Sequence, residues 1–166
     1  MAEGNIGVDG SRVGGTMCAL QERWARRKGR NLSDPRGWGR WAGVTLIGKR
    51  KQSIAIITVY GPTPTANSEG SSWAFQQRQI TNMKDISGDS LQSNPRKQFL
   101  NDLAEEIMGL HLKGSAVIVA GDFNLKKVDL QCWCNALNLG DISNRFTGGA
   151  PTFIRNQNTQ TCIDHI

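Results

Sequence analysis

The sequence is poor in the features that mark membrane-spanning and secreted proteins. No window approaches 18 consecutive apolar residues, so we expect no transmembrane helix and no membrane partner. The first residues, MAEGNIG, contain no apolar segment of the kind found in secretory signals. Together these features predict an intracellular protein.

Cysteine and histidine are also scarce. The chain has two histidines and four cysteines, namely Cys18, Cys132, Cys134 and Cys162. A single residue separates Cys132 from Cys134, which is not the usual spacing of zinc ligands, and no second ligand cluster accompanies them. We therefore expect reduced thiols rather than disulfides or a zinc site.

Positive charge is concentrated in one part of the chain. The net charge is +6, yet residues 1–60 hold 11 Lys/Arg against 4 Asp/Glu, whereas residues 61–166 hold 9 against 10. Such a patch suits a polyanion such as nucleic acid, and it equally suits an ordinary solvated surface. The candidate nucleic-acid-binding residues lie in RWARRKGR and are Arg23, Arg26, Arg27, Lys28 and Arg30.

Hydrophobic patterning predicts several strands. We expect them over residues 14–20, 41–48, 53–60 and 115–122, from Thr152 onward, and over residues 161–166. The run over 53–60 is almost continuously apolar, which predicts that both of its faces are covered, and 115–122 also reads as a buried strand. Residues 1–13 are Gly-rich and unpatterned, so we expect a flexible end there and one domain over 14–166.

Helices are predicted between these strands. Residues 73–86 form one, and residues 95–112 form another, with Pro95 in its first turn and Gly114 after its end. Asp129 is expected to cap a shorter helix. The apolar positions that predict these helix faces are Phe99, Leu103, Ile107 and Leu110, then Leu130, Trp133, Cys134 and Leu137. Strands that alternate with helices without a strict rhythm indicate an α/β fold with mixed sheets.

The stretch AVIVAGDFNLKK ends a strand in a carboxylate and an amide. Residues two apart on an extended chain point the same way, so Asp122 and Asn124 would share one face, with Phe123 on the other as an anchor. A carboxylate can orient a water and an amide can hold a phosphate oxygen, which are the needs of phosphodiester cleavage. The alternative is structural: Asp122 caps a turn in which Asn124 is left-handed.

The pieces around this turn extend the pattern. ITVYGPTP precedes it, and LNLGDI, PTF and CIDHI follow it, while QQRQI and PRKQFLNDL lie between the first piece and the turn. This ordered set resembles the endonuclease/exonuclease/phosphatase superfamily. Within that superfamily it is most similar to the apurinic-type endonuclease domain of non-LTR (LINE-type) retrotransposons. The resemblance covers about residues 14–166.

The resemblance implies a fold, an activity and partners. The fold would be a four-layered α/β sandwich of two mixed sheets flanked by helices. The activity would be cleavage of DNA phosphodiester bonds with Mg²⁺, or Mn²⁺ in its place, to start target-primed reverse transcription. The partners would be DNA and the reverse transcriptase region of the same polyprotein, which implies a nuclear location.

The resemblance also implies a role for each matching residue. Asp122 would orient or deprotonate the attacking water and bind the metal, and Asn124 would bind the scissile phosphate. The hydroxyl of Tyr60 would approach that phosphate, and Thr152 would donate a hydrogen bond within the site. Asp164 would orient the catalytic histidine.

Parts of the family's pattern are not found. A first strand with an Asn, a second with a metal-binding Glu, and a closing Ser-Asp-His motif are missing from the sequence. We therefore expect a fragment of a longer protein, incomplete at both ends and nearly inactive by itself, because a general acid or base contributes about 10²–10⁴-fold. Glu22 is the first candidate for a replacement metal ligand. We expect neither His111 nor His165 to be catalytic, since His165 alternates to the opposite face from Asp164.

Two alternatives stay open. The chain could be a catalytically dead remnant that at most binds nucleic acid through the basic residues of 23–30. It could also be a phosphatase or phosphodiesterase of the same fold that acts on a small phosphoester, because fold and site logic alone do not select the substrate.

Overall fold

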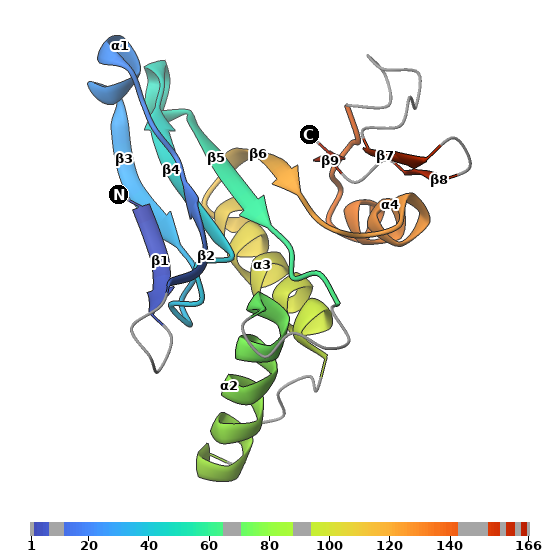
Figure 1. The fold of residues 1–166 in the computed structure, drawn as a ribbon. Helices are drawn as coiled ribbons and strands as arrows, with labels where there is room; N and C mark the ends of the chain where they lie inside the picture. Colours follow the sequence, from blue (N-terminus) through green and yellow to red (C-terminus); the bar gives the residue numbers. More distant parts are fainter. Residues whose placement is uncertain are drawn as a thin grey trace.

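The computed structural model describes residues 2–6, 12–64, 71–87, 94–142, 153–156, 159–161 and 164–165. Its central element is a mixed sheet with the strand order β3-β4-β5-β6-β9 (Figure 1). β5 and β6 run parallel, and the other neighbours in this sheet are antiparallel. The strands are β3 (Lys28–Ser33), β4 (Trp41–Ile47), β5 (Ser53–Tyr60), β6 (Ser115–Asp122) and β9 (Asp164–His165).

Hairpins and helices surround this sheet in the described part of the chain. One hairpin consists of β1 (Ala2–Ile6) and β2 (Arg12–Met17), and another of β7 (Phe153–Asn156) and β8 (Thr159–Thr161). The helices are α1 (Glu22–Ala25), α2 (Ser72–Ser87), α3 (Pro95–Leu112) and α4 (Lys127–Ala136), with a 3-10 turn η1 (Lys49–Lys51) between β4 and β5. The α/β fold with a mixed sheet is as the sequence predicts.

Helix α3 begins and ends where its sequence predicts. Asn94 is its N-cap, and its side-chain oxygen accepts hydrogen bonds from the backbone N–H groups of Arg96 (2.9 Å) and Lys97 (3.3 Å). Pro95 occupies the first turn, where no backbone N–H is needed. The apolar stripe of the helix is fully buried against the sheet and consists of Phe99, Leu103, Ile107 and Leu110.

The two faces of the sheet are covered unequally. α3 packs on the face that carries Ala55, Ile57 and Val59, all of them buried. The hairpin β1–β2 reaches only part of the other face, where the Thr58 hydroxyl donates to the Met17 carbonyl oxygen at 3.3 Å (Figure 1). Ile118 on that face stays 39% exposed. The prediction that both faces of 53–60 are covered is therefore met in part, since Ile54 and Ile56 on the face away from α3 are half-buried, whereas the prediction of a buried strand over 115–122 is wrong at Ile118.

Three local predictions differ from the structure. Residues 2–6 form β1, although residues 1–13 were expected to be a flexible end. Residues 28–33 form β3, which the polar sequence KGRNLS did not indicate; its one buried side chain is Leu32. The N-cap of α4 is Lys126 rather than Asp129, which lies in the first turn. The division of the chain at residue 14 stays a prediction.

Candidate functional site

Three of the predicted site residues lie at one level of the sheet. In the parallel pair β5–β6, Tyr60 is the register partner of Asp122, and in the antiparallel pair β6–β9, Asp122 is the partner of Asp164. Tyr60 and Asp122 both end their strands, so they lie at the carboxyl edge of the sheet, where α/β proteins hold their ligands (Figure 1). Asp122 and Asp164 follow Tyr60 by 62 and 104 positions in the chain, yet the fold places all three at the same level on neighbouring strands.

A set of short hydrogen bonds joins the two strand ends. The Gly61 N–H donates to the Asp122 carbonyl oxygen at 2.7 Å, and the Asn124 side-chain amide donates to the Gly61 carbonyl oxygen at 2.9 Å. The Asn124 backbone N–H donates to the Asp122 carboxylate at 2.9 Å. We refer to Gly61, Asp122, Phe123 and Asn124 as the strand-end turn. Because each bond satisfies a group that leaves the sheet, the turn holds Asp122 in a fixed position.

The structure corrects the reason given for placing Asp122 and Asn124 together. Asn124 has a φ of +50°, so the chain is left-handed there and not extended. The two side chains approach through a local turn of the kind that Asp and Asn favour, which is the structural alternative considered for this stretch. The Asn124 amide nitrogen is thus already bonded to Gly61, and a phosphate would have to displace that bond or approach the amide from another direction.

Phe123 anchors the turn, as predicted. Its side chain is 3% exposed and lies between the rings of Phe99 and Trp133, at centroid distances of 6.4 Å and 6.0 Å. Space beside it is restricted, because a Cβ at Gly61 would lie 2.2 Å from the Phe123 carbonyl oxygen. The close approach of the two backbones therefore requires glycine at position 61.

A buried ionic network lies next to the end of β5, where Tyr60 is located. The Arg40 side chain is fully buried, and its Nε and Nη2 both donate to Asp34 at 2.7 Å, while Nη2 also donates to Asp102 at 2.7 Å. Arg36 forms a bidentate pair with the same Asp102. The Tyr60 N–H donates to the Arg40 carbonyl oxygen at 2.8 Å, so this network fixes the backbone that carries the tyrosine.

Asp102 is the acidic centre of this network. Burial alone would raise its pKa, but the hydrogen bonds and positive charges of Arg36 and Arg40 outweigh burial and leave the pKa below its ordinary value. No pattern in the sequence indicates this network. Its members lie at positions 34–40 and 102, and nothing in their spacing indicates that they meet.

The predicted site residues differ in their exposure and in how far the structure describes them. Tyr60 is 39% exposed, and Asp122 is half-buried. Thr152 lies outside the described residues, and for Asp164 only the backbone position in β9 is described. Glu22 lies far from Asp122, because α1 sits at the opposite end of the strands, where the Ile47 N–H donates to the Arg27 carbonyl oxygen. Glu22 is therefore not placed to replace a metal ligand beside Asp122. His111, in the last turn of α3, lines a hollow together with Val119 and Phe123.

The carboxyl edge of the sheet offers carboxylate oxygens, the type of ligand that Mg²⁺ prefers. Mg²⁺ is usually held by one or two carboxylates, together with waters and substrate phosphates. Asp122 supplies one carboxylate, and Asp164 is its register partner on the neighbouring strand. Within the residues whose placement is described, no group of three or more His, Cys, Asp or Glu side chains forms a complete protein-only metal site.

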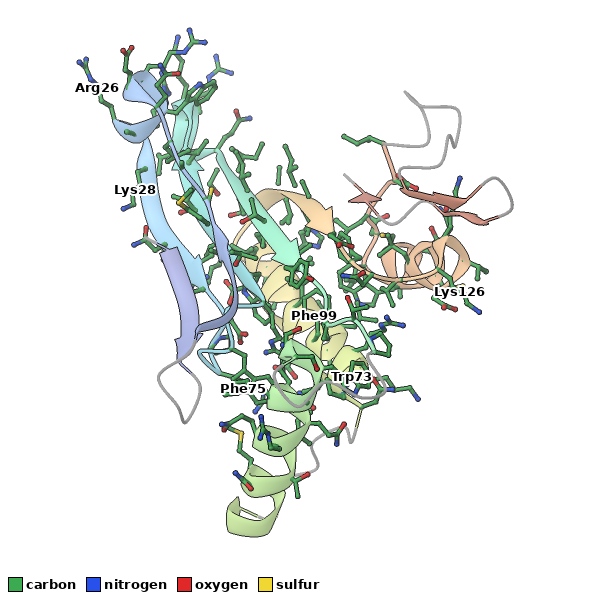
Figure 2. The ribbon with its side chains drawn as sticks, in the orientation of Figure 1. Arg26, Lys28, Trp73, Phe75, Phe99 and Lys126 are labelled. Carbon is green, nitrogen blue, oxygen red and sulfur yellow. The ribbon has the colours of Figure 1, made fainter. Side chains whose placement is uncertain are left out.

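The predicted nucleic-acid-binding residues lie at the other end of the sheet. Arg23, Arg26, Arg27 and Lys28 are exposed on α1 and at the start of β3, whereas Lys126 at the start of α4 lies far from them (Figure 2). Ser53 pairs with Ser115 at this end, and Tyr60 pairs with Asp122 seven residues further along. At about 3.3 Å per residue the two ends are ~23 Å apart. Arg30 is paired with Glu106 of α3 at 2.5 Å.

Comparison with protein-family models, with curated proteins and with solved structures finds no significant match. Across the parts of the chain that the structure describes, no helix combines the length and apolar character needed to cross a bilayer.

Cys18, Cys132 and Cys134 are free thiols. Burial raises the pKa of the Cys134 thiol, and the nearby Asp141 raises it further.

Proposed function

We propose that this chain is a Mg²⁺-dependent phosphodiester endonuclease domain that acts on DNA. The observation that carries the proposal is the register of Tyr60, Asp122 and Asp164 on three adjacent strands. A hydroxyl and two carboxylates at one carboxyl edge supply groups that can orient a water and contact a phosphate. The ordered motifs of the chain resemble those of retrotransposon endonucleases, which supports DNA as the substrate and a nuclear polyprotein with a reverse transcriptase as the context.

Each residue of the edge has a proposed task. Asp122, whose carboxylate also accepts from the Asn124 N–H, orients the attacking water. The Tyr60 hydroxyl, on an exposed side chain, contacts the scissile phosphate. Thr152 and Asp164 keep the tasks that the resemblance implies. Asp122 would hold a Mg²⁺, or Mn²⁺ in its place, which would supply Lewis-acid stabilisation of the phosphate charge.

The proposed domain is a four-layered α/β sandwich of which this chain holds the larger part of one sheet. In the described part of the chain the β1–β2 hairpin lies over β4 and β5, and Ile118 beside it stays partly exposed, which supports a second sheet packed on this face next to the hairpin. We further propose that the chain alone turns over slowly, because the sequence contains no Ser-Asp-His motif. A catalytically dead remnant that binds nucleic acid is the second candidate. It is favoured by the bond between the Asn124 amide and Gly61, which occupies a proposed phosphate donor.

The test is nicking of supercoiled plasmid in Mg²⁺ by this chain, by Asp122→Asn and by the matched control Asp129→Asn. Asp122→Asn keeps an oxygen that can accept from the Asn124 N–H and removes the charge, so folding is preserved. Asp129 is exposed in the first turn of α4, and its replacement removes the same charge elsewhere. We expect slow nicking that needs Mg²⁺, is lost in Asp122→Asn by about 100-fold or more, and is kept in Asp129→Asn.

Other outcomes assign the chain to another candidate. Equal nicking by all three proteins would mean a contaminant and would remove the support for a working site. Binding of DNA without any nicking would favour the remnant. Cleavage of bis(p-nitrophenyl) phosphate that depends on Asp122, in the absence of plasmid nicking, would favour a phosphodiesterase with a small substrate.

A further inference from the structure

A hollow lies at the end of the sheet away from Asp122. Its volume is about 860 Å³, within the range of about 300–1,000 Å³ that is usual for ligand sites. The apolar lining comes from Leu46, Ile47 and Ile54 at the turn between β4 and β5. The rim comes from α1 and η1, and two segments that are distant in sequence meet there because the Ile47 N–H bonds to the Arg27 carbonyl oxygen at 2.8 Å.

The rim is strongly and asymmetrically charged. Over residues 22–28 and 48–54 the chain carries seven cationic side chains and one carboxylate, that of Glu22. Six of these cations are described, and all are exposed: Arg23, Arg26, Arg27, Lys28, Lys49 and Arg50. Arg23, Arg27 and Lys49 line the hollow itself, and the others lie on the same two segments. The sequence indicated only the first segment. Folding adds Lys49 and Arg50 to the cluster and removes Arg30, which pairs with Glu106.

Apolar and aromatic groups are exposed inside this charged rim. Trp24 is 47% exposed and Ile47 is 54% exposed, and both line the hollow. The Arg23 guanidinium lies over the Trp24 ring, 5.4 Å from its centroid. An exposed indole among guanidinium and ammonium groups offers a stacking surface next to phosphate-binding charges.

We propose that this end of the sheet binds single-stranded nucleic acid, with one unstacked base against Trp24 and the apolar lining and with phosphates on the surrounding cations. Guanidinium groups bind phosphate oxygens in a fork geometry, and a base face stacks on indole whatever its sequence. This site goes beyond the proposed nuclease site, because it uses none of Tyr60, Asp122 or Asn124 and lies ~23 Å from them along β5.

Two other anionic partners fit the same end less well. A duplex keeps its bases stacked and paired, so it would leave Trp24 and the apolar lining without a partner. A bilayer surface is broad and flat, whereas the apolar residues here line a concave hollow whose rim includes Arg23, Arg27 and Lys49. A single strand supplies both a free base and closely spaced phosphates.

The test measures binding of a fluorescein-labelled 12-nucleotide oligodeoxynucleotide by anisotropy, in EDTA so that no cleavage occurs. Trp24→Ala should weaken binding about 5- to 100-fold, the range for loss of one stacked base, whereas Trp24→Phe should retain most of the affinity. Arg50→Gly removes one charge where φ is +57°, a conformation that glycine adopts readily. Combined with Arg27→Gln it should reduce the slope of log affinity against log salt by about 1.4.

The matched control for this double variant is Arg78→Gln combined with Lys97→Gln, which also removes two positive charges, at exposed positions on α2 and α3. It should bind the oligonucleotide within about twofold of the unchanged chain. The proposal is overturned if Trp24→Ala binds normally, if a duplex of the same sequence binds as tightly, or if phosphatidylserine vesicles bind with the same dependence on Trp24. Because EDTA stops the proposed nuclease chemistry, this outcome is independent of the nicking result.

Discussion

At the residue scale, Asp122 combines a structural and a proposed chemical task. One carboxylate oxygen accepts from the Asn124 N–H, which ties the side chain to the strand-end turn. A carboxylate has two oxygens and about four lone-pair directions, so a single hydrogen bond does not by itself saturate it. The turn therefore positions the carboxylate that the proposed reaction uses.

Asp102 should make the stability of the fold depend on acid. Its pKa in the folded chain lies below the ordinary value of 3.8, because the pairing with Arg36 and Arg40 outweighs burial. The stabilisation is therefore complete above about pH 4 and is lost as the pH falls through the lower pKa of the folded state. Urea unfolding at pH 2–7 should show a midpoint that falls below pH 4.

The same network predicts the effect of Asp102→Asn at neutral pH. Removing one partner leaves the fully buried Arg40 under-compensated, so the free energy of unfolding should fall by about 3–5 kcal/mol. Its fall below pH 4 should also become shallower. Asp129→Asn controls for the change in net charge. An unchanged urea midpoint in Asp102→Asn would mean that the network of Asp34, Arg36, Arg40 and Asp102 does not stabilise the fold.

At the element scale, local signals predicted some elements and not others. Helix α3 was predicted to the residue, because a first-turn proline and a regular apolar stripe act within the helix itself. β3 was missed, because its strand conformation comes from antiparallel pairing with β4 and its own sequence buries only Leu32. A strand at an edge of a sheet needs little apolar sequence, since its neighbour supplies the hydrogen bonds.

Helix α3 should contribute to stability mainly through its buried stripe. Leu103 is fully buried, so Leu103→Ala should lower the free energy of unfolding by about 2–5 kcal/mol through lost contacts and a cavity. Leu112, on the same helix, is 90% exposed, and Leu112→Ala should change it by less than about 0.5 kcal/mol. Chemical denaturation of the three proteins gives both values. Similar losses for both variants would contradict the packing of α3 on the sheet.

At the scale of the whole molecule, the candidate site could be predicted only in part. In the sequence, Asp122 and Tyr60 are two separate polar ends of apolar runs. The resemblance to the endonuclease/exonuclease/phosphatase superfamily implies that they belong to one site. Their adjacency depends on the parallel register of β5 and β6, which side-chain periodicity alone does not fix between distant strands. The same register sets the strand-end turn and the separation of ~23 Å between Asp122 and the basic patch, and the sequence predicts neither of them.

The unequal cover of the sheet predicts unequal tolerance of its two faces. Val119 faces α3 and is buried, whereas Ile118 points away and is 39% exposed. Val119→Thr should lower the free energy of unfolding by about 1–3 kcal/mol, because it buries a hydroxyl in the core. Ile118→Thr should lower it by less than about 1 kcal/mol in the isolated chain. Denaturant midpoints measure both, and a larger loss for Ile118→Thr would mean that its face is covered in solution.

The parallel pairing of β5 and β6 also sets an order of assembly. β4 and β5 pair across a short turn that joins Ile47 to Ser53, and such hairpins close in about 1–10 μs. Ser53 and Ser115 are 62 positions apart in the chain, so their pairing closes a much longer loop, which carries a larger entropy penalty. The hairpin with the basic end is therefore available early in folding, and the edge with Tyr60 and Asp122 exists only once α3 has docked. A growing chain on the ribosome would thus complete its charged end before its proposed reaction centre.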